Sequence, residues 1–475
     1  MTIPTVGAIH ELPLQKDLPA GWVTVSLTDI ADINPKLDKS DIPENLMVAF
    51  VPMQTVGAGD GRIDTNLNKP FAEVKKGYTP FQSGDVLFAK ITPCMENGKI
   101  AVVPTLHNKL GFSSTEFHVI RPKDVVDPRY IYYYISRLDY RKEAASKMKG
   151  AVGQKRVPSD FIKVSAIPLA PLAQQKLIVA EIEKHFSRLD ESVTNLKRVK
   201  ANLKRYKAAV LKAAVEGKLT EEWRKQHPDV DPASELLKRI LAERKKKWEE
   251  KNPRKKYKEP ATPDTSNLPE LPKGWVWARM DGIAALKGGI TVDKNRKDPT
   301  ARLVPYLRVA NVQRGFIDLH EVKEIEAPAA DIEELRLLTG DILFNEGGDR
   351  DKLGRGWIWE AQLPECIHQN HVFRARLFVN EMSSRFISWW GNSFGKLYFL
   401  REGKQTTNLA SINLTKLSEF PVPIPALHEQ QIITAEVEKL LSIAEEIEIA
   451  IEANLKRAER LRQAILKKAF SGKLI

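Results

Sequence analysis

The chain has 475 residues, more than one ordinary hydrophobic core accommodates, which predicts at least two domains. Hydrophobic residues at 42% and charged residues at 28% exclude a disordered or collagen-like chain. No apolar run approaches the ~18 residues of a membrane span, and no secretion signal is visible. The two cysteines, Cys94 and Cys366, lie far apart in the sequence. We therefore expect a protein of the reducing cytoplasm without a disulfide framework.

The net charge of +13 is concentrated in one stretch of the chain. Residues 197–258 contain 21 Lys/Arg and 9 Asp/Glu, a local net charge of +12, so the remainder is nearly neutral. Concentrated positive charge without an apolar face favours nucleic acid over membrane as the partner. A solvated basic helix and linker without any partner is the alternative that charge alone leaves open.

One pattern of motifs occurs twice in the chain, about 255 residues apart. Ordered recurrence at an almost constant offset predicts a tandem duplication. The five matches are Leu18-Pro19-Ala20-Gly21-Trp22 with Leu271-Pro272-Lys273-Gly274-Trp275, Val51-Pro52 with Val304-Pro305, Gly84-Asp85-Val86-Leu87-Phe88 with Gly340-Asp341-Ile342-Leu343-Phe344, Gln174-Gln175 with Gln430-Gln431, and Gly217-Lys218-Leu219 with Gly472-Lys473-Leu474.

Each copy predicts a globular α+β domain followed by one long helix. Short β-rich segments at 85–91, 116–120 and 371–377 predict strands, and residues 129–148 and 384–400 predict helices. In chain order we expect an N-terminal tail (1–17), a first globular domain (18–171), a first long helix (172–219), a short basic helix near 233–251 with a linker (together 220–267), a second globular domain (268–425) and a second long helix (426–475).

Both long helices carry apolar residues at the 3.5-residue spacing of a coiled-coil seam. No third ladder of this kind occurs, so we expect the two helices to pair antiparallel within the chain, with a globular domain at each end of the rod. The predicted seam residues are Ile178, Ile182, Leu189, Leu196, Leu203, Val210, Ile433, Val437, Leu440, Ile447, Ile451, Leu461 and Ile465.

The sequence lacks the common motifs of catalysis. It has no phosphate-binding GxxxxGK[ST] loop, no Asn/Asp-Pro-Pro-aromatic loop of an adenine methyltransferase and no zinc-ligand spacing. Asp64 with Glu73-Val74-Lys75, and Asp318 with Glu321-Val322-Lys323, are similar to the Asp…Glu-x-Lys set of Mg²⁺ nucleases. That pattern is short and its residues are common, so ordinary surface loops are the simpler interpretation. We expect no metal and no cofactor on this chain.

Side chains suited to reading DNA are instead concentrated in a few segments. Gln and Asn bind adenine bidentately, Arg binds guanine, and Lys binds phosphates. The candidate DNA-binding residues are Lys90, Asn97, Lys99, Gln154, Lys155, Arg156, Arg350, Lys352, Arg355, His368, Gln369, Asn370, His371, Arg374, Lys404, Gln405, Thr407 and Asn408.

The duplicated order of these motifs resembles the specificity subunits of type I restriction-modification enzymes. The Leu-Pro-x-Gly-Trp opening, the Gly-Asp-[Val/Ile]-Leu-Phe strand, the Gln-Gln pair and the Gly217-Lys218-Leu219 helix end carry the resemblance. Residues 92–99 and 346–371 are similar to sequences in the family's target-recognition domains. The resemblance implies two target-recognition domains, each reading one part of a split DNA sequence, with the two long helices as a ruler for the unread spacer.

The resemblance also implies a set of partners and no catalysis by this chain. Double-stranded DNA, two modification subunits that use S-adenosylmethionine, and restriction subunits that use ATP and Mg²⁺ are expected. Such a complex methylates adenine and serves in phage defence. Two alternatives stay open at this point: a self-contained DNA methyltransferase or nuclease with degenerate motifs, and a two-module coiled-coil transcription factor.

Overall fold

The computed structural model describes residues 18–151, 153–293, 298–348, 353–402, 404–405 and 410–475. The chain divides into two compact units: unit 1 is Met1–Val199 with Ala450–Ile475, and unit 2 is Lys200–Ile449. Each unit therefore combines one globular domain with a segment of both long helices. Among the described residues, no helix is long and apolar enough to cross a membrane.

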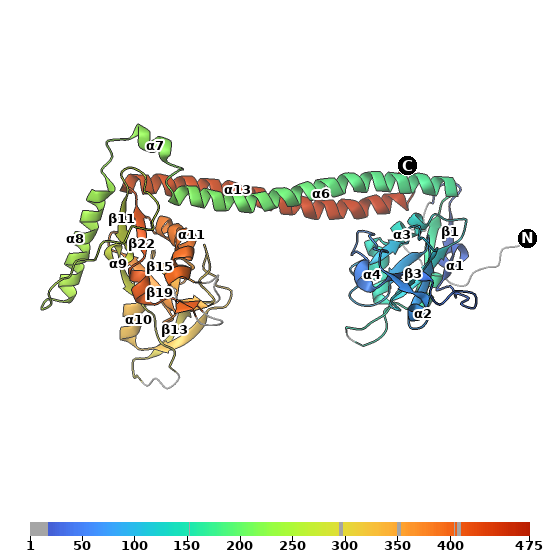
Figure 1. Cartoon of the computed structure of the whole chain (residues 1–475), viewed down its shortest axis with the longest axis horizontal. Coiled ribbons are helices and arrows are strands. Elements are labelled where there is room, and N and C mark those ends of the chain that lie inside the picture. The colour runs from blue at the N-terminus through green and yellow to red at the C-terminus, as the bar shows by residue number, and fades with distance from the viewer. Residues whose placement is uncertain (1–17, 152, 294–297, 349–352, 403, 406–409) are drawn as a thin grey trace, which may run out of the picture. The chain divides into compact units, whose positions relative to one another are not determined.

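The globular part of unit 1 contains short strands and helices (Figure 1). They are β1 (Val23–Ser26), α1 (Leu27–Ile30), β2 (Ala31–Ile33), β3 (Met47–Val51), the 3-10 turn η1 (Met53–Thr55), β4 (Asn68–Pro70), α2 (Phe71–Val74), β5 (Thr79–Gln82), β6 (Val86–Ala89), β7 (Ile100–Val102), β8 (Leu110–Ser113), β9 (Phe117–Pro122), α3 (Pro128–Ile135), α4 (Leu138–Ser146), α5 (Ser159–Val164) and β10 (Ala166–Leu169).

In unit 2, a short helix and a basic helix lie between the end of the first long helix and the globular part. Its elements are α7 (Glu221–Gln226), α8 (Ala233–Lys251), β11 (Val276–Arg279), α9 (Met280–Ile283), β12 (Ala284–Lys287), β13 (Arg302–Leu307), β14 (Lys323–Ala327), α10 (Ala329–Leu335), β15 (Ile342–Asn345), β16 (Gly347–Gly348), β17 (Gly356–Ile358), β18 (Ile367–His368), β19 (Val372–Leu377), α11 (Ser384–Glu402), β20 (Lys404–Gln405), β21 (Ala410–Ser411), α12 (Leu414–Ser418) and β22 (Pro421–Ile424).

The two globular parts share most of their sheet topology, but β5 of unit 1 has no counterpart among the named strands of unit 2. The antiparallel sheet β2-β9-β6-β7 of unit 1 corresponds to β12-β19-β15-β17 of unit 2. A second sheet, β4-β3-β8-β5, corresponds to β14-β13-β18, and each contains one parallel pair. In unit 2, α11 covers the first of these sheets, and Phe344, Phe386 and Phe399 are buried between them (Figure 1).

The repeated Gly-Asp motif forms a turn before the central strand of each unit. Gly84 and Gly340 have φ of 86° and 90°, the left-handed region that glycine adopts without strain. The buried Asp85 accepts a hydrogen bond from the Gln82 amide at 2.6 Å and a bidentate pair from Arg121. Asp341 has the same partners in unit 2, the Leu338 amide and Arg376. The motif therefore stabilises the frame of each domain.

The repeated Trp and Gln residues join each globular domain to the start of its long helix. The Trp22 indole donates to Gln174 at 3.0 Å, and the Trp275 indole donates to Glu429 at 2.8 Å. The buried Gln175 amide nitrogen donates to the Ala170 carbonyl, as that of Gln430 does to the Pro425 carbonyl. Structurally, Gln175 thus corresponds to Gln430, and the sequence match of Gln174 with Gln430 was wrong by one residue.

The long helices are α6 (Leu172–Val215) and α13 (Leu427–Ala469), and they pair antiparallel within each unit (Figure 1). In unit 1, Arg462 of α13 pairs with Asp190 of α6 and lies over the Phe186 ring. In unit 2, Lys207 of α6 pairs with Glu448 of α13 at 2.7 Å. The predicted α+β class with an antiparallel helix pair is confirmed.

Burial along the predicted seam is uneven. Leu189, Leu196 and Leu440 are half-buried, and Ile447 and Leu461 are exposed by 42% and 46%. A groove of about 450 Å³ in unit 1 is lined by Leu189, Leu196, Leu461 and neighbouring residues. Two helices alone therefore leave apolar surface uncovered. The remaining seam residues are buried: Ile178, Ile182, Leu203, Val210, Ile433, Val437, Ile451 and Ile465.

Candidate nucleic-acid interface

In unit 1, three chain segments that are distant in sequence meet beyond the end of β6. Arg156 forms isolated β-bridges with Ile91 on one side and Lys149 on the other. The Val157 amide donates to the Lys90 carbonyl at 2.8 Å, and the Thr92 amide donates to the Lys155 carbonyl at 3.0 Å. We call residues 90–92, 116, 149–151 and 153–157 the first platform. It brings together the predicted Lys90, Gln154, Lys155 and Arg156.

The charges of the first platform are partly paired. Arg156 forms a salt bridge with Glu116 at 2.7 Å, and its hydrogen bonds lower the pKa of the Glu116 carboxyl. Burial lowers the pKa of Lys90, while Glu116 opposes that shift. Gln154 and Lys155 are exposed, and their side chains make no hydrogen bond or ion pair with the described residues. They are the side chains free to bind an outside partner.

Unit 2 builds the same arrangement about 255 residues later. Ser411 of β21 pairs with Gly347 of β16 and with Lys404 of β20, as Arg156 pairs with Ile91 and Lys149 in unit 1. The Ile412 amide donates to the Glu346 carbonyl at 2.8 Å. We call residues 346–347, 371, 404 and 411–412 the second platform. Here His371, which is exposed, pairs with Glu346.

Some predicted residues belong to the fold rather than to a DNA-facing surface. His368 is fully buried, its Nδ1 lies 2.6 Å from the Val372 carbonyl, and burial lowers its pKa to about 3. Arg374 is buried and donates to the carbonyls of Glu334 and Arg336. A buried side chain cannot reach a base edge, so the assignment of these two residues to DNA contact is corrected. Lys99 donates to the Met53 carbonyl.

Other predicted residues stay in the candidate set. Asn97 is exposed in the loop before β7, and Gln369 and Asn370 are half-buried in the turn between β18 and β19. Arg355 donates to the Val309 carbonyl. Of the remainder, Arg350, Lys352, Thr407 and Asn408 lie outside the described residues, and for Lys404 and Gln405 only the backbone of β20 is described.

Glu116 and Glu346 are platform residues that the sequence did not single out. Each lies next to a residue that was predicted, Arg156 and His371 respectively, but in the sequence they are separated by 40 and 25 positions. The signals were that Glu116 opens a predicted strand and that Glu346 opens the segment 346–371, which resembles target-recognition domains. A carboxylate at such a place can accept a hydrogen bond from the amino group of cytosine.

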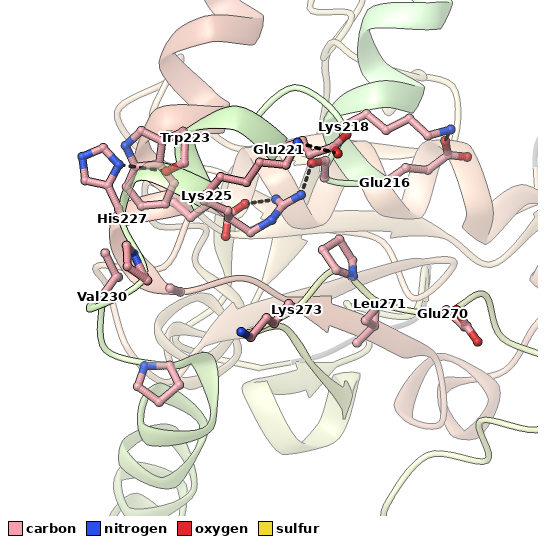
Figure 2. Close-up of a pocket in the computed structure, with 18 residues that line it drawn as sticks. Glu216, Lys218, Glu221, Trp223, Lys225, His227, Val230, Glu270, Leu271 and Lys273 are labelled. Atoms are coloured by element: carbon pink, nitrogen blue, oxygen red, sulfur yellow. Dashed lines mark hydrogen bonds and ion pairs between the residues drawn. The ribbon is translucent and has the colours of Figure 1, made fainter.

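A cavity of about 790 Å³ in unit 2 lies between α7, the linker and the start of α13 (Figure 2). Figure 2 shows Trp223 beside His227, whose rings stack at 4.7 Å. The buried Glu429 accepts hydrogen bonds from Thr220 at 2.6 Å and Trp275 at 2.8 Å and pairs with Arg224. Glu429 and its three partners thus bind one another. We therefore assign this cavity to the structural support of the domain and not to a ligand site.

Replacing Glu429 by alanine is expected to destabilise unit 2. The change leaves Arg224, Thr220 and the Trp275 indole without their shared acceptor, which costs about 3–5 kcal/mol for a broken buried pair. The matched control is Gln174→Ala, which removes one hydrogen bond from Trp22 and costs about 1 kcal/mol. Thermal unfolding of the two full-length variants measures the difference. Equal shifts in Tm would contradict the role assigned to Glu429.

The nuclease-like residues are engaged locally. Lys75 pairs with Glu44 at 2.5 Å, Asp64 accepts from the Asn66 amide, and Asp318 accepts from the His320 amide. Within the described ranges, no cluster of three or more His, Cys, Asp or Glu side chains could hold a metal ion. The geometry therefore gives no support to the nuclease alternative.

Comparison with known proteins shows which class the chain is similar to. The family model of the type I restriction modification DNA specificity domain matches residues 19–204. The chain is 29% identical to the EcoAI specificity subunit of Escherichia coli and 26% identical to the EcoEI specificity subunit, each over 96% of this chain and 83% of the relative. Over almost its whole length, the chain is similar to the specificity subunits of type I restriction-modification enzymes.

Two solved structures have the same fold at 20% sequence identity. One comes from work on complex assembly and conformational transition of the type I R-M system, with a TM-score of 0.65 over 96% of this chain and 99% of that chain. The other is the HsdS subunit from Thermoanaerobacter tengcongensis, with a TM-score of 0.59 over 97% of this chain and 99% of that chain.

Proposed function

We propose that the chain is the non-catalytic subunit that directs a type I restriction-modification complex to a bipartite DNA sequence, each globular domain reading one half-site. The observation that carries this proposal is the repeated platform with different side chains. The first platform presents Lys90, Glu116 and Arg156, and the second presents Glu346 and His371 at the equivalent places. A shared frame with different polar groups suits two modules that read different bases.

We further propose that α6 and α13 act as a ruler for the unread spacer and as the docking site of two modification subunits. Lengths of 44 and 43 residues make each helix roughly 65 Å long at 1.5 Å per residue. The exposed apolar residues Tyr206, Ile447 and Leu461 lie on these helices. Exposed apolar patches of this kind mark surfaces that a partner covers.

The remaining partners follow from the same proposal. Double-stranded DNA is the target, and the complex acts in the cytoplasm. S-adenosylmethionine is expected on the modification subunits, and ATP and Mg²⁺ on the restriction subunits. This chain supplies the DNA sequence preference and no reacting group.

Reconstitution of methylation tests this proposal. Modification subunits of the same restriction-modification system, mixed with plasmid DNA and S-adenosylmethionine, are expected to methylate adenine only when this chain is added. The chain alone with S-adenosylmethionine is expected to leave the DNA unmodified. Methylation by the chain alone would instead favour a self-contained methyltransferase, and sequence-specific methylation without the chain would remove its proposed role.

Replacing Gln369 or Asn370 by alanine is expected to reduce the sequence discrimination of the complex at one half-site. Their side-chain amides make no hydrogen bond with the described residues and lie beside the exposed His371 of the second platform. Loss of one bidentate base contact costs about 1–3 kcal/mol of discrimination. Binding of the assembled complex to duplexes with single substitutions in each half-site measures this loss. Wild-type discrimination in both variants would assign the turn a structural role only.

A further inference from the structure

Helix α8 and the chain that follows it lie between the two copies of the repeat and hold much of the positive charge. Residues 233–258 contain 11 Lys/Arg and four acidic residues. The sequence alone does not show whether this charge forms a surface or is spread along a linker. The contacts of the segment decide between these two cases.

The segment after α8 folds back along the helix. Arg244 of α8 pairs with the Tyr257 hydroxyl and donates to the Lys258 carbonyl at 3.2 Å. The Tyr257 ring lies edge-on against Trp248, with 5.4 Å between ring centroids. The Lys245 ammonium group lies over the Tyr257 ring, 6.0 Å from the ring centroid. Tyr257 therefore holds residues 254–258 against one side of α8.

Helix α8 is itself fixed to the globular domain of unit 2. Ala233, Leu236 and Ile240 are buried in the core of that domain. Arg244 also donates to the Asp281 carbonyl at 2.9 Å, and Lys247 donates to the Phe378 carbonyl at 2.8 Å. Residues 254–258, which we call the fold-back, are therefore held at a defined place on the domain.

Because residues 254–258 fold back on α8, five cations of the helix and this segment come near one another, and we call them the basic surface: Lys245, Arg254, Lys255, Lys256 and Lys258. All five are exposed, and none pairs with a carboxylate among the described residues. In contrast, Lys238 on the same helix is paired with Glu235 at 2.8 Å. Duplex DNA carries about one charge per 1.7 Å of its axis, so several phosphates lie within reach of such a group.

The surroundings of the basic surface favour a polyanion over an apolar partner. No large hydrophobic side chain between residues 228 and 268 is among the exposed ones in the part of the chain that the structure describes. A membrane anchor or an apolar protein interface would require such side chains.

Helix α8, which carries the basic surface, contacts the end of β19 that is opposite the second platform. Lys247 contacts Phe378, directly after the end of β19, whereas His371 directly precedes its start. A strand of this length spans about 20 Å at 3.3 Å per residue, close to six base pairs at about 3.4 Å each.

We propose that the basic surface binds phosphates of duplex DNA outside the bases that the second domain reads. This inference rests on the proposed function of the chain in DNA recognition. The contact is independent of sequence, so it adds affinity for flanking DNA and leaves the target sequence unchanged.

The test compares duplexes with long and short flanks. The variant Arg254→Gln/Lys255→Gln/Lys256→Gln leaves Arg244, Trp248 and Tyr257 in place, so the fold-back is kept. The full-length chain, assembled with its modification subunits, is titrated with target duplexes carrying about 15 or about three flanking base pairs beside the second half-site. The variant is expected to bind the long duplex at least about tenfold more weakly at low salt, with the slope of log K against log salt reduced by about 3. Binding to the short duplex is expected to stay at the wild-type level.

The matched control removes the same charge elsewhere in unit 2. Lys218→Gln/Lys225→Gln/Lys273→Gln changes lysines around the cavity of Figure 2 and is expected to keep wild-type binding to both duplexes. Equal losses in the two variants, or no loss in the first, would overturn the proposal. Weaker assembly with the modification subunits at unchanged DNA affinity would overturn it in favour of a protein contact. If the wild-type complex itself showed no preference for its target on either duplex, the proposed function would fail instead.

Discussion

Replacing residues 20–165 by the equivalent domain of a relative is expected to change one half of the methylated sequence and to leave the other half as it was. The exchanged segment contains the whole first platform, including Lys90, Glu116 and Arg156. It ends before α6, so both long helices are kept. The change in specificity is complete at the first half-site, because every platform side chain is replaced at once.

Methylome sequencing of cells with the exchanged chain and the modification subunits measures this result. The control is a second chimaera in which residues 20–165 again come from the relative, but the positions of Gln154 and Lys155 keep the residues of this chain. It is expected to restore part of the original preference at the first half-site. A change in both half-sites would contradict independent reading by the two domains.

Inserting one heptad into each long helix is expected to lengthen the unread spacer by about three base pairs. Seven residues add about 10 Å at 1.5 Å per residue and preserve the seam positions. Placing the insertions after Lys200 and after Ile449 leaves the buried Ile182, Val210 and Val437 in their own domains. Both half-sites are expected to keep their sequences.

Two controls separate the ruler from a general effect of insertion. A heptad in α6 alone shifts its pairing with α13, including Lys207 with Glu448, and is expected to reduce methylation. Seven Gly/Ser residues after Thr265, in the linker, are expected to leave the spacer unchanged. An unchanged spacer in an active complex with both helices lengthened would show that the helices are not the ruler.

The sequence predicted the features that depend on local periodicity. The apolar ladders predicted α6 and α13, and the basic helix near 233–251 corresponds to α8. The same ladders did not show that Ile447 and Leu461 are exposed, because burial of a seam residue depends on how many helices surround it.

The platforms could not be predicted from the sequence, since they depend on pairing between distant segments. Ile91, Lys149 and Arg156 meet through single bridges, which leave no periodic signal. His368 was chosen for its polar neighbours, but it lies in the two-residue strand β18, which is too short to predict and places the imidazole in the core. Polar composition marked the right segments without showing which side chains point outward.

We expect the two tandem domains to direct adenine methylation to a split DNA sequence. The most direct measurement is the map of methylated adenines in a genome that lacks the system, after expression of the modification subunits with and without this chain. We expect one new methylated motif with this chain, made of two specified halves around an unread spacer of constant length. The same methylated positions without the chain, or an undivided motif, would contradict it.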